Sequence, residues 1–193
     1  LAAPPFMHGA GHWLAFITLH GGGTLLIQNV VDRLDPHDLL ATIEREKVNL
    51  IVIVGDAFTD IAAPEHLVTL EFFKLVSDRL KPEGIFAMNL LDNVNRLDAL
   101  AAVVATLREV FPSVEVWTNA VRPEPGERRI FVLLASENDS VVSRIDAPAP
   151  EMTRFQALDT DFINSVLDRK HAQILTDDHA PLNYLMGFDS VIE

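Results

Sequence analysis

A run of apolar, mostly β-branched residues ends in a carboxylate close to position 56. The residues from Asn49 to Val54 have the composition of a buried strand, and Gly55 and Asp56 follow them directly. Open α/β sheets bind their ligands in the crevice outside the carboxyl ends of the strands. The run therefore predicts that Asp56 stands beside a ligand. The alternative is a loop aspartate that caps the turn after it.

Strand-like and helix-like segments alternate on both sides of this run. Strands are expected at 24–28, 50–54, 85–90, 114–118 and 130–135, and helices from 36 onward and at 70–80, 95–111 and 160–170. Strands separated by single helices indicate a parallel sheet, whereas the Pro/Gly turn at 122–128 indicates that the last two strands pair antiparallel. Residues 137–150 are expected to be a polar connection, and the end of the chain an irregular tail.

This alternation predicts an α/β fold, with a Rossmann-like, parallel-rich sheet and an antiparallel carboxyl-terminal edge. The helix that begins at Pro36 follows Asp35 as its cap, and Thr69 is expected to cap the helix at 70–80.

Composition narrows the classes of partner. The chain has 193 residues, 49% of them hydrophobic, with a formal net charge of −13 and no cysteine. The acidic balance argues against nucleic acid and favours small or cationic ligands. The lack of cysteine fits a reducing, cytoplasmic compartment. The apolar stretch at 13–19 is too short to span a membrane, and the first 23 residues lack a basic leader. Because the chain begins with Leu1, we expect it to be a fragment.

Asp56 and the loop after it form the candidate site. A carboxylate at the end of a strand can accept a proton from an amine nucleophile, or orient that amine. The loop at 59–68, which carries Asp60, Glu65 and His66, is expected to fold over a ligand as a lid. For His66 a solvated or helix-capping role is the simpler interpretation.

Two clusters contain ligand-like residues without predicting a metal site. Asp177 and Asp178 are adjacent, and adjacent residues of an extended segment point in opposite directions, which favours a structural role for both. His8 and His12 are four residues apart, but two glycines lie between them and no third ligand accompanies them. The glycines at 21–23 precede a predicted strand, so we interpret them as a helix-to-strand turn and not as a phosphate loop.

Four segments between about residue 54 and the end share the pattern of one family: 55–60, 64–73, 82–89 and 175–181. They resemble spermidine synthase-like proteins, which have a class I methyltransferase-type Rossmann fold. The resemblance implies that Asp56 is the catalytic residue that activates the amine, and that decarboxylated S-adenosylmethionine or S-adenosylmethionine is the donor, with a small-molecule amine as acceptor and no metal. It also implies a set of substrate-binding residues, which are Ala57, Phe58, Thr59, Asp60, Pro64 and His66. Thr59 stands where aminopropyltransferases often carry a second aspartate.

Residues 1–58 resemble a second family. The matching runs are 4–13, 22–24, 32–36 and 43–49, and they are similar to a piece of an AMP-forming acyl-CoA synthetase. The ATP loop and the later motifs of those ligases are not recognisable. The Gly-rich nucleoside loop that should precede Asp56 in the transferase family is not recognisable either, so the Rossmann-like sheet is expected to be incomplete.

The sequence thus predicts two overlapping parts, an acyl-CoA synthetase-like segment at 1–58 and a spermidine synthase-like part at 54–193. The expected function is that of a spermidine synthase-like aminopropyl or S-adenosylmethionine-type transferase fragment, with its catalytic competence left open. One alternative is a remnant acyl-CoA ligase whose His8, His12 and Trp13 line an acyl pocket. Another is a non-catalytic α/β module that associates through an unpaired sheet edge, with itself or with a partner; a homodimer is also left open.

Overall fold

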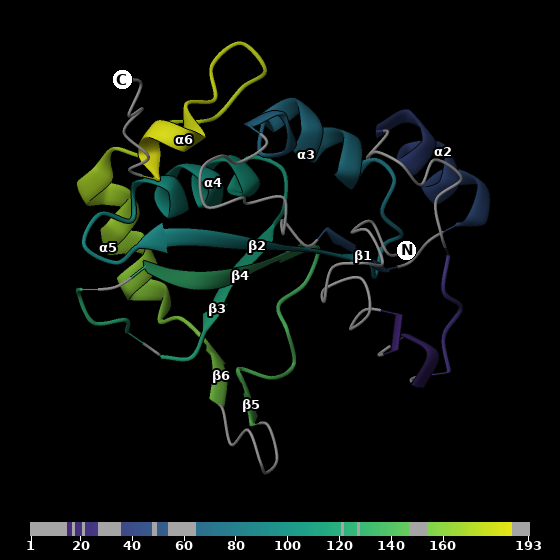
Figure 1. Cartoon of the computed structure of the whole chain (residues 1–193), viewed down its shortest axis with the longest axis horizontal. Helices are drawn as coiled ribbons and strands as arrows, with labels where there is room; N and C mark the ends of the chain where they lie inside the picture. The colour runs from purple at the N-terminus through teal and green to yellow at the C-terminus, as the bar shows by residue number, and fades with distance from the viewer. Residues whose placement is uncertain are drawn as a thin grey trace, which may run out of the picture.

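The computed structural model describes residues 15–16, 18–20, 22–26, 36–47, 50–53, 65–120, 122–126, 128–146 and 154–186. Within them the chain forms helices and strands in mixed order (Figure 1). The strands are β1 (Leu50–Ile53), β2 (Ile85–Asn93), β3 (Ser113–Thr118), β4 (Arg128–Ser136), β5 (Arg144–Asp146) and β6 (Arg154–Ala157). The helices are α2 (Pro36–Glu46), η1 (Glu65–Leu67), α3 (Leu70–Ser77), α4 (Asp98–Arg108), α5 (Thr160–Lys170) and α6 (Leu182–Leu185).

The described strands form one sheet in the order β1-β2-β4-β3-β6-β5. The pair β1–β2 is parallel, with Leu50 opposite Ile85, and the other four pairs are antiparallel. The α/β class is confirmed, and so is the antiparallel pairing of the last two predicted strands. The parallel-rich sheet is not confirmed in the described strands. A short connection joins β3 to β4, which favours an antiparallel pair, and β4 then lies between β2 and β3.

Helix α3 starts where its cap predicts. The hydroxyl of Thr69 accepts a hydrogen bond of 3.2 Å from the backbone N–H of Phe72. The helix ends at Ser77, three residues before the predicted end, and the turn at Lys81–Gly84 leads into β2. Its inner face contributes Phe73 and Val76 to the core.

The core lies between the sheet and the helices drawn above it in Figure 1. Phe86 of β2 is at its centre, where its ring contacts those of Phe73, Phe72 and Phe111 at centroid distances of 5.7, 6.4 and 6.3 Å. The apolar positions that helical spacing predicts within 95–111 are buried, namely Leu97, Leu100, Val104, Leu107 and Phe111, although α4 itself spans only Asp98–Arg108. Among the described residues, the core cluster takes its members from Val68 to Met186.

Several local predictions differ from the structure. The strand expected at 24–28 is absent from its described part, 24–26, where no other strand pairs with the chain. The glycine turn before it is confirmed on its helical side, since the N–H of Gly23 bonds to the carbonyl of Thr18 at 2.8 Å. Strands β5 and β6 fall in the expected polar connection and just after it, and α6 falls in the expected irregular tail. In the described part of the chain, no helix is long and apolar enough to cross a bilayer.

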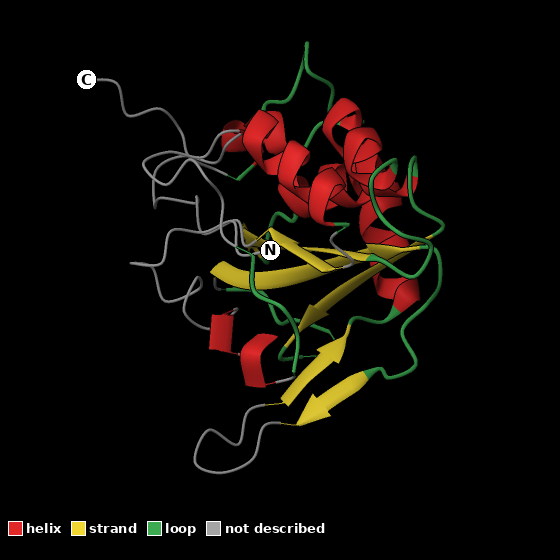
Figure 2. Ribbon diagram, turned by 90° about the vertical axis from the view of Figure 1, so that its right-hand side faces the viewer, coloured by secondary structure: helices red, strands yellow, loops and turns green. Residues whose placement is uncertain are grey.

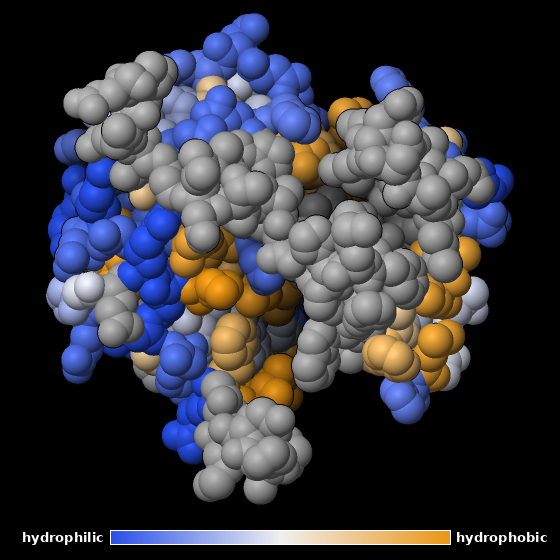
Figure 3. Space-filling model, in the orientation of Figure 1, coloured by the Kyte–Doolittle hydropathy of each residue, from blue (hydrophilic) through white to orange (hydrophobic). Residues whose placement is uncertain are grey.

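Hydrophilic and hydrophobic residues gather on different parts of the surface. On the face shown in Figure 3, hydrophilic residues cover much of the left side, and hydrophobic ones gather in the centre and on the right. The hydrophilic surface fits the strongly acidic composition of the chain.

Candidate functional site

Most of the predicted site lies outside the described residues. These are Asp56, Ala57, Phe58, Thr59, Asp60 and Pro64, together with His8, His12 and Trp13 of the alternative acyl pocket. His66 is described. It lies on η1 and is exposed. The structure therefore places one member of the predicted substrate-binding set.

The fold brings the segment around His66 together with the segment 175–180. The N–H of Asp177 donates a 3.0 Å hydrogen bond to Oε2 of Glu71 across 106 positions of sequence. The N–H of Leu70 donates another, of 2.8 Å, to the carbonyl of Leu175. Two of the four family-like motifs, 64–73 and 175–181, thus share one site.

The carboxylate of Glu65 extends this junction to α6. Its Oε1 accepts hydrogen bonds from the side-chain and backbone N–H groups of Asn183, at 3.0 and 3.4 Å. The turn η1, which lies near the end of the predicted lid loop at 59–68, is therefore tied to α6, the last helix of the described chain.

A hollow of about 530 Å³ lies where these segments meet. Apolar and acidic side chains both line it, together with His66 and Thr69. The lining consists of Glu65, His66, Thr69, Glu71, Phe72, Leu75, Asp177, Asp178 and Ala180. Such a surface attracts cationic ligands that have an apolar part. No group of three metal-ligating side chains converges anywhere in the described ranges, so the carboxylates of this hollow are not arranged as a metal centre.

Asp177 and Asp178 do not follow the expectation for an extended segment. Thr176 and His179 form a two-way backbone bridge, with hydrogen bonds of 3.1 and 2.9 Å, so the two aspartates sit at the tip of a tight turn. A turn does not alternate side chains as a strand does. Both aspartates are exposed and line the same hollow.

Thr106 of α4 anchors the segment from the inside. Its hydroxyl donates to the carbonyl of Ala102 at 2.7 Å and accepts the N–H of Leu175 at 2.9 Å. Both Thr106 and Leu175 are fully buried. A single threonine in a mostly apolar helix carries no local signal of this long-range role, and sequence reasoning missed it.

A second residue that sequence reasoning missed is Asp92, near the carboxyl end of β2. Its buried carboxylate accepts the N–H of Leu100 at 2.8 Å and that of Asn93 at 2.6 Å. Burial raises the pKa of Asp92 to about 6, and the two hydrogen bonds oppose that rise. Because its oxygens hold backbone groups at the start of α4, Asp92 positions that helix and does not face the hollow.

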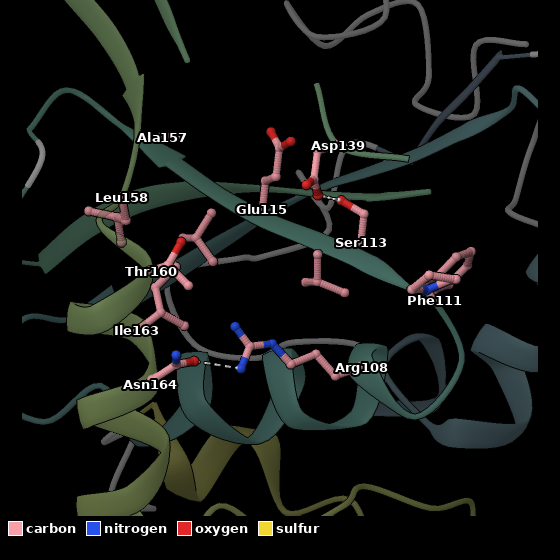
Figure 4. A pocket seen from close by; sticks show the side chains of 13 residues that line it. Arg108, Phe111, Ser113, Glu115, Asp139, Ala157, Leu158, Thr160, Ile163 and Asn164 are labelled. Carbon is pink, nitrogen blue, oxygen red and sulfur yellow. Dashed lines mark hydrogen bonds between the residues drawn. The ribbon is translucent and has the colours of Figure 1, made fainter. Parts of the chain in front are cut away.

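A larger cavity of about 640 Å³ lies beside the amino-terminal half of β3, between α4 and α5 (Figure 4). Two pairs of its polar side chains are hydrogen-bonded: Arg108 donates to Asn164 at 2.9 Å, and Ser113 donates to Asp139 at 2.6 Å. Burial lowers the pKa of Arg108. Two carboxylates, Glu115 and Asp139, line this cavity together with the basic Arg108, whereas four carboxylates and no Arg or Lys line the hollow around His66. It is therefore the weaker candidate.

Comparisons with known proteins show a similar fold in a solved structure and partial sequence matches to two curated proteins. No family model matches the chain. A probable spermidine synthase from Corynebacterium glutamicum superposes with a TM-score of 0.55 at 19% identity, over 86% of this chain and 61% of that one. The chain therefore shares the fold of that protein and spans less than two thirds of it.

The two curated relatives match shorter stretches. The medium-chain acyl-CoA ligase Mig of Mycobacterium avium is 46% identical over 54 residues, which are 28% of this chain and 10% of the ligase. That match lies in the amino-terminal part. The N-terminal histidine N-methyltransferase of Emericella nidulans is 34% identical over 100 residues, which are 51% of this chain and 18% of the relative. The chain thus spans less than a fifth of either relative.

Proposed function

We propose that this chain is part of a transferase that moves an aminopropyl or methyl group from an S-adenosyl donor to a small amine. The observation that carries the proposal is the junction of the His66 segment with the 175–180 turn around one acidic hollow. The shared fold with a probable spermidine synthase and the partial match to an N-methyltransferase support the same reaction class.

The chemistry of the donor and acceptor fits this lining. A sulfonium donor and a protonated amine are both cations, and four carboxylates border the hollow beside the apolar Phe72 and Leu75. Such a surface favours approach of cations and gives a methylene chain a wall to lie on. Glu65 is held in place by Asn183 and Glu71 by the backbone N–H of Asp177, so these two carboxylates of the border are fixed by hydrogen bonds.

In the proposed reaction, Asp56 accepts the proton that the ammonium group of the acceptor must lose. The amine lone pair then attacks the carbon attached to sulfur, the carbon–sulfur bond breaks, and its electron pair stays on sulfur as a thioether. The proton leaves Asp56 for water. Positioning of the amine in line with the carbon–sulfur bond supplies most of the rate, because it turns an encounter of two molecules into a step within one complex.

Calorimetric titration tests the donor class. The probes are methylthioadenosine, S-adenosylhomocysteine, ATP and a fatty acyl-CoA, each added to the full chain. Binding of either thionucleoside, with none by ATP or acyl-CoA, is expected. Binding of acyl-CoA alone would instead favour the acyl-ligase interpretation of residues 1–58, and binding of none of the four would contradict the proposal.

The role of Asp56 is tested by turnover. Asp56→Asn removes the proton acceptor, and a general base contributes about 10²–10⁴-fold to a rate, so transfer is expected to fall by that factor. Binding of the thionucleoside should be unchanged. Asp168→Asn, an exposed position on α5, serves as the control. Equal rates for the wild type and Asp56→Asn would rule out the assignment of Asp56.

A further inference from the structure

Strand β5 lies at one end of the sheet that the described strands form. It is the last strand in the sheet order, and β6 is its only neighbour among the described strands. All three of its residues are exposed, and Val141, just before it, is fully so at 101%. In both ribbon views β5 and β6 project away from the helical layer (Figures 1 and 2). Exposed edges that carry apolar side chains are templates for pairing with another strand.

The backbone groups that face outward can be assigned. In an antiparallel ladder, residues alternate between those whose N–H and C=O face the neighbour and those whose groups face away. The carbonyl of Ser143 accepts the N–H of Ala157 on β6. The backbone N–H and C=O groups of Ser143 and Ile145 therefore point toward β6. Those of Arg144 and Asp146 point outward, away from β6.

The same strand is complementary to itself. If a second copy of β5 lies antiparallel with Ile145 opposite Ile145, Arg144 of each copy stands directly opposite Asp146 of the other. The outward-facing groups of Arg144 and Asp146 then form hydrogen-bonded pairs, and Ile145 falls in a non-hydrogen-bonded pair, where side chains are closest. Opposite charges placed directly across two strands stabilise the pair, as do facing apolar side chains.

We propose that a second copy of this chain pairs with β5, antiparallel about Ile145, and joins the two sheets into one. The interface is isologous, because the same three residues serve both copies. In the single chain, Arg144 and Arg154 both bind Asp146, at 3.0 and 2.7 Å, and these side chains remain partly exposed. In the pair, each Arg144 gains the carboxylate of the other copy.

Charge complementarity selects a second copy over an unrelated strand. An arbitrary strand would have to present an acid opposite Arg144 and a base opposite Asp146, while the sequence Arg-Ile-Asp does so for itself when reversed. The inference is independent of the proposed transfer reaction, since β5 contributes no residue to the hollow around His66.

Sedimentation equilibrium of the full chain tests the pairing. The wild type is expected to reach twice its 21.4 kDa with rising concentration. Arg144→Asp leaves two acids facing each other in a pair of identical copies, and Asp146→Arg leaves two bases facing each other. Each variant alone should therefore associate at least tenfold more weakly. An equimolar mixture of the two should recover wild-type association, because the two acids on β5 of one variant then face the two bases on β5 of the other.

Arg154→Asp is the matched control. It removes an ion pair to Asp146 within the chain but leaves the residues opposite the second copy unchanged, so its association should stay near that of the wild type. Far-ultraviolet circular dichroism and a thermal unfolding scan of each variant establish that it is folded. A wild type that stays monomeric at millimolar concentration would overturn the inference. So would a mixture that associates no better than its components.

Discussion

The backbone N–H of Leu100 donates to Oδ2 of Asp92, which lies eight positions earlier in the sequence and is completely buried. The contact joins the end of β2 to the first turn of α4. It also places an ionisable group inside the core, where desolvation penalises the charged form. Stability is therefore expected to depend on pH through this one carboxyl.

The direction of this pH dependence follows from the raised pKa of Asp92. Between its ordinary 3.8 and about 6, Asp92 holds its proton in the folded chain and loses it in the unfolded chain. The contribution of Asp92 to the free energy of unfolding thus falls as the pH rises through that window, by roughly 3 kcal/mol in total. Asp92→Asn cannot ionise, so its stability relative to the wild type should improve by roughly 2 kcal/mol from pH 4 to pH 7. Urea unfolding at both pH values measures this; a constant difference would contradict it.

Thr106→Val should loosen the segment that borders the hollow. The variant keeps the shape of the side chain but leaves the N–H of Leu175 without its acceptor in a buried place, at a cost of about 1–3 kcal/mol in unfolding free energy. Thr106→Ser keeps the hydroxyl and should cost less. Urea denaturation of the two variants checks this, and equal losses would show that the methyl group matters rather than the hydrogen bond.

Phe86→Ala removes the ring around which the aromatic cluster packs. Phe86 is 1% exposed, and the substitution leaves a cavity, so a loss of about 3–5 kcal/mol in unfolding free energy is expected. The neighbouring Ile85 faces the other side of β2 and is 37% exposed, which makes Ile85→Ala the control with a much smaller loss. Similar losses at the two positions would place the core elsewhere.

Glu71→Ala breaks the hydrogen bond that ties the turn at Asp177 to α3. This hydrogen bond is exposed, so its removal lowers stability by about 1 kcal/mol. The destabilisation is local to the turn at Asp177. Amide hydrogen exchange at Asp177 should then accelerate about fivefold, while exchange in α4 stays unchanged. Glu83→Ala, in the turn before β2, is the matched control. An unchanged rate at Asp177 would exclude the tie.

Regular segments with strong local signals could be predicted. Helix α5 spans the predicted residues 160–170, and Thr69 caps α3, because spacing and capping act within a few residues. The antiparallel pairing of β3 and β4 followed from their short connection. Strands β5 and β6 were missed because they are only three and four residues long and mostly polar, and their pairing is set by distant parts of the chain.

The site was predictable only in pieces. The motifs at 64–73 and 175–181 are visible in the sequence, but their junction through Glu71 and Asp177 depends on how α3 packs beside α4. In the sequence, Asp92 and Thr106 cannot be told from ordinary polar residues. Their role becomes visible only in the folded chain, where both are buried and hydrogen-bonded. Local patterns carry no information about which polar group a fold will enclose.

Strand β1 lies at one end of the described sheet and is joined to it through a single parallel ladder with β2. An inner strand such as β4 shares a ladder with a neighbour on each side. Detachment of β1 would therefore break one strand pair and leave the antiparallel pairs β2–β4 and β3–β4 intact, so this end of the described sheet can separate without opening its middle.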